Sequence, residues 1–89
     1  MPNSNINMVM KQEIYHPETS QSLPSIGNSY AIGIQATPGT QFYFNGDKSN
    51  IITMGPSGIY QINFFEPIIT SIDFESTVNS LPIIIDYVQ

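Results

Sequence analysis

The 89-residue sequence contains no cysteine, no arginine, one histidine and two lysines. Without cysteine, the chain cannot form a disulfide scaffold, a thiolate zinc site or a cysteine nucleophile. Two basic residues can neutralise few phosphates, and the formal net charge is -5. We therefore expect neither nucleic acid nor an anionic membrane surface as a partner.

Long apolar runs are also missing. No stretch approaches the roughly 20 apolar residues of a membrane span. The first twelve residues lack both the basic region and the continuous apolar segment of a secretory signal. We expect synthesis in the cytoplasm and no membrane insertion, with exit only by lysis or as part of a larger particle.

The residue types needed for catalysis are scarce. A serine-histidine-aspartate triad would depend on His16, the single histidine, which precedes a proline in an irregular stretch. One histidine and no cysteine leave transition metals without ligands, and the carboxylates are too scattered for a calcium loop. We therefore predict that the protein is not an enzyme and uses no metal or cofactor.

The apolar residues that are present favour β-structure. The chain has fifteen isoleucines, five phenylalanines and five tyrosines, but only two leucines and two alanines. Isoleucine and the aromatic residues suit a pleated sheet, whereas leucine and alanine suit helices. Serine, asparagine, glycine and proline are plentiful and favour turns. The composition predicts a single all-β domain.

Alternation of apolar and polar residues predicts about six strands, at 30–36, 41–45, 50–54, 59–65, 67–75 and 81–88. The Asn45-Gly46 dipeptide predicts a tight hairpin, because both central positions of a type I′ turn need a positive φ. Turns are also expected at 37–40 and 55–58.

The strand spacing is typical of a sandwich or a small barrel, and we predict a small antiparallel β-sandwich over residues 30–89. Residues 1–29 are expected to form an irregular N-terminal arm or edge strand. The inward-facing positions of the strands give the expected core: Ile32, Ile34, Phe42, Phe44, Ile52, Tyr60, Ile62, Phe64, Ile72, Phe74, Ile83 and Ile85.

Other apolar residues should lie outside this core, either in the arm or on outward-facing strand positions. Because the core is small, we predict that these residues contact other subunits. The candidate subunit contacts are Met8, Met10, Ile14, Tyr15, Ile59, Ile69, Ile84 and Val88. Tyr43, Asn45 and Asp47, at and beside the Asn-Gly turn, are the candidate ligand contacts of an alternative, a small carbohydrate-binding or host-recognition module.

Four short motifs in order resemble a module of tail-associated proteins from phages and prophages of Gram-positive bacteria. They are FYFNG at 42–46, IITMGPSGIY at 51–60, ITSIDF at 69–74 and IIDY at 84–87. The module usually has an acidic residue after the GIY run, where this sequence has Gln61. The match covers roughly half of the chain.

The resemblance implies a virion structural role in the tail, baseplate or fibre region. The partners would be other tail proteins and further copies of this chain, in a trimer or hexamer. The protein would be in the host cytoplasm during assembly and then in the virion. The resemblance implies scaffold roles: Gly55 and Gly58 hold a turn, Tyr60 and Tyr87 pack or hydrogen-bond, and Asp86 accepts a neighbouring donor.

Overall fold

Seven β-strands and no helix make up the regular structure of the described residues, 9–17, 26–63, 69–79 and 81–89 of this computed structural model. The strands are β1 (Met10–Tyr15), β2 (Ala31–Gln35), β3 (Gln41–Phe44), β4 (Ile52–Thr53), β5 (Ile59–Asn63), β6 (Ile72–Ser76) and β7 (Ile83–Val88). The prediction of an all-β chain is confirmed.

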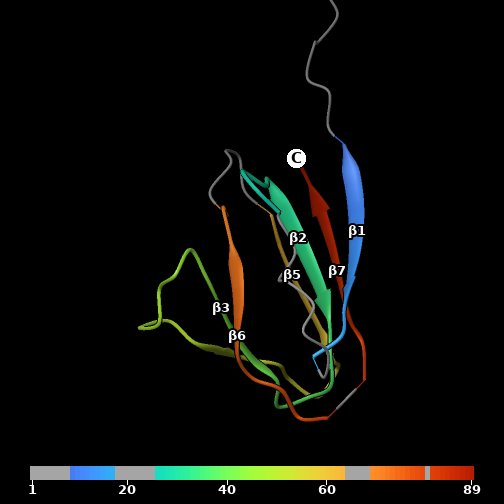
Figure 1. Ribbon diagram of the computed structural model, residues 1–89, viewed down its shortest axis with the longest axis vertical. Coiled ribbons are helices and arrows are strands. Elements are labelled where there is room, and N and C mark those ends of the chain that lie inside the picture. The colour runs from blue at the N-terminus through green and yellow to red at the C-terminus, as the bar shows by residue number, and fades with distance from the viewer. Residues whose placement is uncertain (1–8, 18–25, 64–68, 80) are drawn as a thin grey trace, which may run out of the picture.

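The strands form two antiparallel sheets that make a small sandwich. One sheet has four strands in the order β1-β7-β2-β5, and the other has three in the order β4-β3-β6. Figure 1 shows the four-stranded sheet on one side, with β1 as its outermost strand, and β3 and β6 on the other side. The C-terminal strand β7 therefore lies between β1 and β2, which are far from it in sequence.

Aromatic side chains join the two sheets. The Phe42 ring of β3 meets the Tyr60 ring of β5 edge-on, with centroids 5.3 Å apart. Near the opposite edge, Tyr15 of β1 stacks on Phe74 of β6, with centroids also 5.3 Å apart and planes at 6°. Such pairs add about 0.5–1.5 kcal/mol to the burial of their area. They fix how the two sheets face each other.

The expected core is confirmed where the strand alternation is regular. The buried predicted residues are Ile32, Ile34, Phe42, Ile72, Ile83 and Ile85. Those that are half-buried and packed against this cluster are Phe44, Ile52, Tyr60, Ile62 and Phe74. Phe64 lies outside the described residues.

Six further hydrophobic side chains are buried that were not in the expected core: Ile26, Ala36, Tyr43, Met54, Ile69 and Tyr87. The expectation that Ile69 faces outward is wrong, since its side chain is 1% exposed. The strand expected at 67–75 is regular only from Ile72, and Ile69 instead bridges to Ser29. The alternation therefore changes phase between Ile69 and Ile72.

The N-terminal segment contributes to the sandwich. β1 pairs with β7 along its whole length, from Met10 opposite Val88 to Tyr15 opposite Ile83. Ile26 is wholly buried, so residues close to β2 pack into the core although we assigned them to the arm. The division of the chain at residue 29 remains a prediction.

The Asn-Gly turn has the expected backbone but not the expected tight hairpin. Asn45 and Gly46 both have positive φ, at 56° and 70°, and Asp47 N–H donates to the Phe44 carbonyl. The chain then makes a second turn before β4, which has only two residues. The turn chemistry was predicted correctly, and the return strand is shorter than expected.

Candidate functional site

The outer face of the four-stranded sheet, directed away from the three-stranded sheet, gathers most of the candidate contact residues. Because the four strands pair in register, its side chains lie in three rows that cross the sheet. The two flanking rows are mostly apolar, with Asn63 in one and Gln35 in the other, and the side chains of the middle row are polar.

Five of the eight predicted subunit contacts lie in the two apolar rows. Met10 and Val88 are opposite each other in one row, and Ile14 and Ile84 are opposite each other in the other. Ile59 on β5 ends the second row, beyond Gln35. The exposed fractions of Met10, Ile14 and Ile59 are 81%, 46% and 54%, so much of their apolar surface is in contact with solvent.

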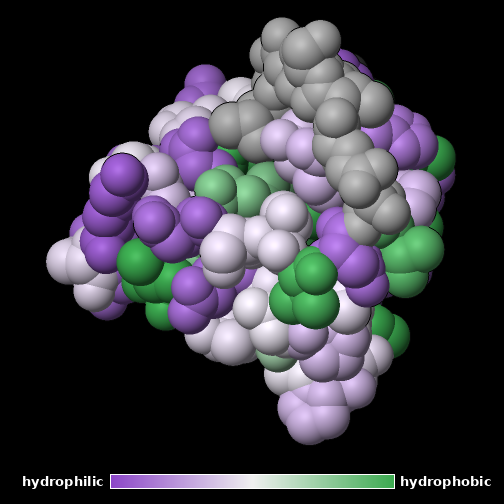
Figure 2. Space-filling model, turned by 60° about the horizontal axis from the view of Figure 1, so that its bottom comes forward, coloured by the Kyte–Doolittle hydropathy of each residue, from purple (hydrophilic) through white to green (hydrophobic). Residues whose placement is uncertain are grey.

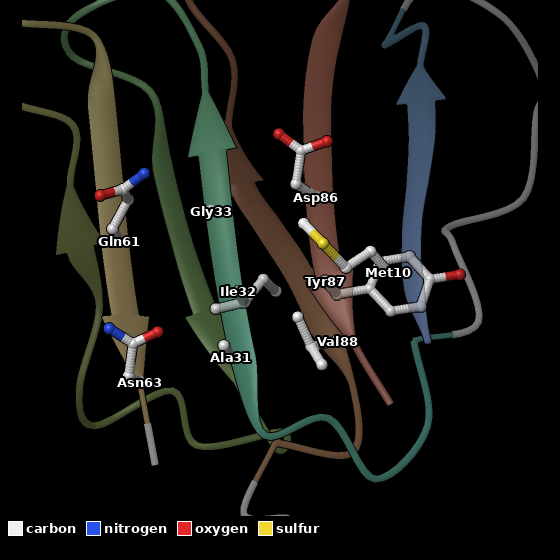
Figure 3. Close-up of a pocket in the computed structure, with 9 residues that line it drawn as sticks. All are labelled: Met10, Ala31, Ile32, Gly33, Gln61, Asn63, Asp86, Tyr87 and Val88. Atoms are coloured by element: carbon white, nitrogen blue, oxygen red, sulfur yellow. The ribbon is translucent and has the colours of Figure 1, made fainter. Parts of the chain in front are cut away.

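The middle row has a glycine at its centre and a hollow above it. Gly33 lies between Asp86 of β7 and Gln61 of β5. Figure 3 shows the Asp86 carboxylate and the Gln61 amide on either side of this position, which has no side chain. The hollow has a volume of about 270 Å³, and its remaining lining includes Met10 and Asn63.

The lining of the hollow is mixed, with polar groups of Gln61, Asn63 and Asp86 among apolar side chains. The Gln12 side-chain amide donates to Asp86 Oδ1 at 2.8 Å, which orients the carboxylate, and Gln61 is exposed. The resemblance implies that Asp86 accepts a neighbouring donor, and here that donor is the amide of Gln12. The sequence analysis did not single out Gly33 as part of a site. A glycine inside a regular strand is the available signal, since it marks a place where something can approach the backbone.

Two of the remaining contact candidates have other environments. Tyr15 is on the inner side of β1 and stacks on Phe74. Ile69 is buried in the core. Met8 lies outside the described part of the chain.

In Figure 2, apolar side chains reach the visible surface at several separate points between polar ones.

The three candidate ligand contacts are engaged within the protein. Tyr43 was expected at the surface but is 8% exposed, and Lys48 Nζ lies 5.9 Å from its ring centroid. The Asn45 side-chain oxygen accepts from the backbone N–H and the hydroxyl of Thr70. Lys48 belongs to the loop after β3, whereas Thr70 lies in the segment before β6, so these contacts connect the two segments.

Asp47 stabilises its own turn. Its carboxylate accepts from the backbone and hydroxyl of Ser49 and from the amide of Asn50. These hydrogen bonds, chiefly the one from the Ser49 hydroxyl, hold the pKa of Asp47 below its ordinary value. Oδ1 accepts two of these hydrogen bonds and Oδ2 accepts one, so the carboxylate is already largely engaged within its own turn.

A buried tyrosine anchors the edge strand β1. The Tyr87 hydroxyl donates to Glu13 Oε2 at 3.0 Å. Burial, and then the hydrogen bond and negative charge of Glu13, raise the pKa of Tyr87 above its ordinary value. Burial alone raises the pKa of Tyr60. These shifts are structural, since both rings belong to or pack against the core cluster.

Among the described residues, no group of three or more histidine, cysteine, aspartate or glutamate side chains is placed to hold a metal ion. The same residues include no helix long and apolar enough to cross a membrane.

No protein-family model, curated protein or solved structure matches the chain. Any inference about function therefore starts from the residues of the chain itself, and first from those on the outer face of the four-stranded sheet. This face has two mostly apolar rows and, between them, a hollow bordered by the side chains of Asp86 and Gln61.

Proposed function

We propose that the protein is a structural subunit of a phage tail, baseplate or fibre region and acts through subunit contacts. Its partners are other virion tail proteins and further copies of itself. It is present in the host cytoplasm during assembly and in the virion tail afterwards. The four sequence motifs that resemble tail-associated proteins support the proposal that the protein belongs to the tail.

The proposed contact surface is supported by the positions of five apolar residues. Met10, Ile14, Ile59, Ile84 and Val88 lie on one face of one sheet, although they come from three strands that are distant in sequence. Burying such side chains against a partner yields roughly 25 cal/mol per Å² of apolar area, before the costs of association. The polar middle row supplies the hydrogen bonds that set orientation.

The contact surface is tested by two variants matched in exposure. Ile59 on the outer face and Val78 in the loop after β6 are both 54% exposed. We expect Ile59→Glu to shift the protein toward monomer in light scattering behind a sizing column, and Val78→Glu to leave the mass unchanged. Equal behaviour of the two variants would exclude the outer face as the contact surface.

The location in a particle has a separate test. Immunogold labelling of particles released by cells that carry the gene should mark the tail. Particles that carry no label along the tail, from cells that express the protein, would contradict the virion role itself.

The hollow over Gly33 favours a second candidate function, a small carbohydrate-binding or host-recognition module. Carboxylate and amide groups on either side of an open backbone position can hydrogen-bond sugar hydroxyls. The ligand would then contact Asp86 and Gln61 rather than Tyr43, Asn45 and Asp47. A glycan array bound by the wild-type protein and not by Asp86→Asn would favour this candidate.

A further inference from the structure

A single charged side chain lies on the outer face of the four-stranded sheet. The three rows of this face are Met10, Val88, Ala31 and Asn63; Gln12, Asp86, Gly33 and Gln61; and Ile14, Ile84, Gln35 and Ile59. Among the side chains in these rows, only that of Asp86 is charged. Gln12 donates to Asp86 Oδ1, and within the described part of the chain Asp86 Oδ2 has no hydrogen-bond partner.

This carboxylate limits what can cover the outer face. Another subunit that buries the apolar rows would also take Asp86 out of water. A carboxylate that is buried without a cation is strongly destabilising, whereas one that is paired and hydrogen-bonded is tolerated. The surface that covers the face must therefore bring a basic group to the middle row.

The chain has few basic groups that could supply this cation. They are Lys11, His16 and Lys48, since the sequence contains no arginine. Lys11 alternates to the inner side of β1, opposite Tyr87. His16 follows β1 and already interacts within its own chain. Lys48 is therefore the best placed of the three to reach a second copy.

The loop that carries Lys48 projects from the protein. Figure 1 shows the chain after β3 extending away from both sheets, and residues 45–51 are exposed. Lys48 Nζ lies 5.9 Å from the ring centroid of Tyr43, and Ile51 is 41% exposed. The loop thus presents a cation and an apolar side chain together, which is the chemical complement of a carboxylate between apolar rows.

The hollow over Gly33 offers three acceptors to an ammonium group. Gln61 and Asn63 line it together with Asp86, and within the described part of the chain their side-chain amides make no hydrogen bond. An ammonium group has three donors, one for Asp86 Oδ2 and one for each amide oxygen. The apolar stem of a lysine would pack beside Met10 while its charged end meets these oxygens.

Lys48 and Asp86 of one copy lie on different sides of the four-stranded sheet. Lys48 follows β3, which belongs to the three-stranded sheet, whereas Asp86 is directed away from that sheet. The pair can therefore form only between two copies.

We infer that Lys48 of one copy enters the hollow over Gly33 of a neighbouring copy and pairs with Asp86, while Ile51 packs on the apolar rows beside it. This inference rests on the proposed role as an assembly subunit and names the contact between copies. Because the contact joins two different patches, it can repeat around a ring such as a trimer or hexamer.

Charge reversal at either residue tests the pairing. Lys48→Asp would place two carboxylates together at every junction, and Asp86→Lys would place two ammonium groups together. We expect each variant to raise the dissociation constant of the assembly at least about tenfold, measured by sedimentation equilibrium. A double variant with both substitutions restores an opposite-charge pair and should recover most of the wild-type affinity. This recovery would also show that neither substitution prevents folding.

Lys11→Asp is the matched control, because it makes the same change of charge at the other lysine. It should leave the dissociation constant unchanged. If Lys11→Asp weakens the assembly as much as Lys48→Asp, the effect comes from the net charge and the inference is overturned. Lys48→Gln and Asp86→Asn remove one charge without adding the opposite one, so each should weaken the assembly less than the corresponding reversal.

Zero-length cross-linking locates the contact in the wild-type protein. A carbodiimide joins an amine to a carboxylate that it touches, without a spacer. In an assembly mixed from isotope-labelled and unlabelled protein, mass spectrometry should find Lys48 of one copy joined to Asp86 of another. Asp86 joined to Lys11 and not to Lys48 would overturn the inference.

The outcomes separate the inference from the proposed function. An assembly that keeps its mass in both reversal variants overturns the contact between Lys48 and Asp86 and leaves the assembly role intact. A double variant that stays as weak as the single variants has the same consequence. A wild-type protein that remains monomeric overturns the contact, and the virion role is then decided by the immunogold labelling alone.

Discussion

The two faces of the four-stranded sheet differ sharply although the same strands form both. On β7, Ile83, Ile85 and Tyr87 face the other sheet and are 2%, 0% and 3% exposed. The alternate residues Ile84, Asp86 and Val88 face outward and are half-buried. The inner face stabilises the fold, and the outer face keeps apolar surface available for contact.

Under the proposed assembly role, the small domain would divide its isoleucines between folding and subunit contacts. A chain of this size buries only about 60–65% of the surface that it exposes when unfolded, so each core side chain carries a large share of the stability. The outer rows contribute less to folding because solvent still reaches them. Substitutions on the two faces should therefore separate stability from association.

The largest separation is expected between two neighbouring isoleucines of β7. Ile85 is wholly buried, and Ile85→Ala should lower the free energy of unfolding by about 2–5 kcal/mol through lost burial and a cavity. Ile84 is half-buried on the outer face, and Ile84→Ala should cost about 1 kcal/mol. Urea unfolding followed by circular dichroism measures both changes. Equal losses would mean that the outer face is covered as completely as the core.

A smaller effect is expected at the junction between the core and the edge strand. Tyr87→Phe keeps the buried ring but removes the hydrogen bond to Glu13, and should cost about 1 kcal/mol at neutral pH. The raised pKa of Tyr87 favours the neutral hydroxyl in the folded state. Its contribution is therefore full below the ordinary value of 10.0 and is lost as the pH rises through the folded pKa.

The pH dependence supplies the control for this variant. Free energies of unfolding measured from pH 7 to pH 11 should differ between wild type and Tyr87→Phe at low pH and converge above pH 10. A difference that stayed constant over this range would show that the substitution acts through packing and not through the hydroxyl.

Regular alternation predicted the inner face of the sheet, and tertiary contacts decided the positions that it missed. Ile32, Ile34 and Ile85 follow a strict period of two and were placed correctly. Ile26 lies in an irregular segment, where burial depends on tertiary contacts and not on a local period, whereas Met54 follows the alternation of Ile52 just beyond the end of β4. Ile69 lies before the point at which β6 becomes regular, so its phase could not be extrapolated from Ile72.

The candidate site could be predicted only in part from the sequence, because tertiary contacts decide which residues meet. The outward direction of Ile59, Ile84 and Val88 follows from alternation within their own strands. Their meeting on one face depends on the strand order β1-β7-β2-β5, which joins distant parts of the chain. Pairing across the sheet is also what places Gly33 between Asp86 and Gln61 and so creates the hollow.

The smallest effect is expected at Gly33, and its sign is the informative part. A Cβ atom there would meet Gln61 Cγ at 3.7 Å and Asp86 Cβ at 4.0 Å, which are ordinary contacts. Gly33→Ala should therefore raise the free energy of unfolding by about 0.4–1 kcal/mol, because alanine restricts the unfolded chain. Thermal unfolding of the two proteins side by side measures the change.

Gly58→Ala is the matched control with the opposite sign. Gly58 has a φ of 70°, and a Cβ atom there would lie 2.9 Å from the Ala36 carbonyl oxygen, so the substitution should be destabilising. If Gly33→Ala is neutral or destabilising as well, the hollow does not have the free space that the structure gives it. If Gly33→Ala stabilises the fold, the wild-type glycine forgoes that stability to keep the centre of the outer face open, as a contact surface requires and a purely structural strand does not.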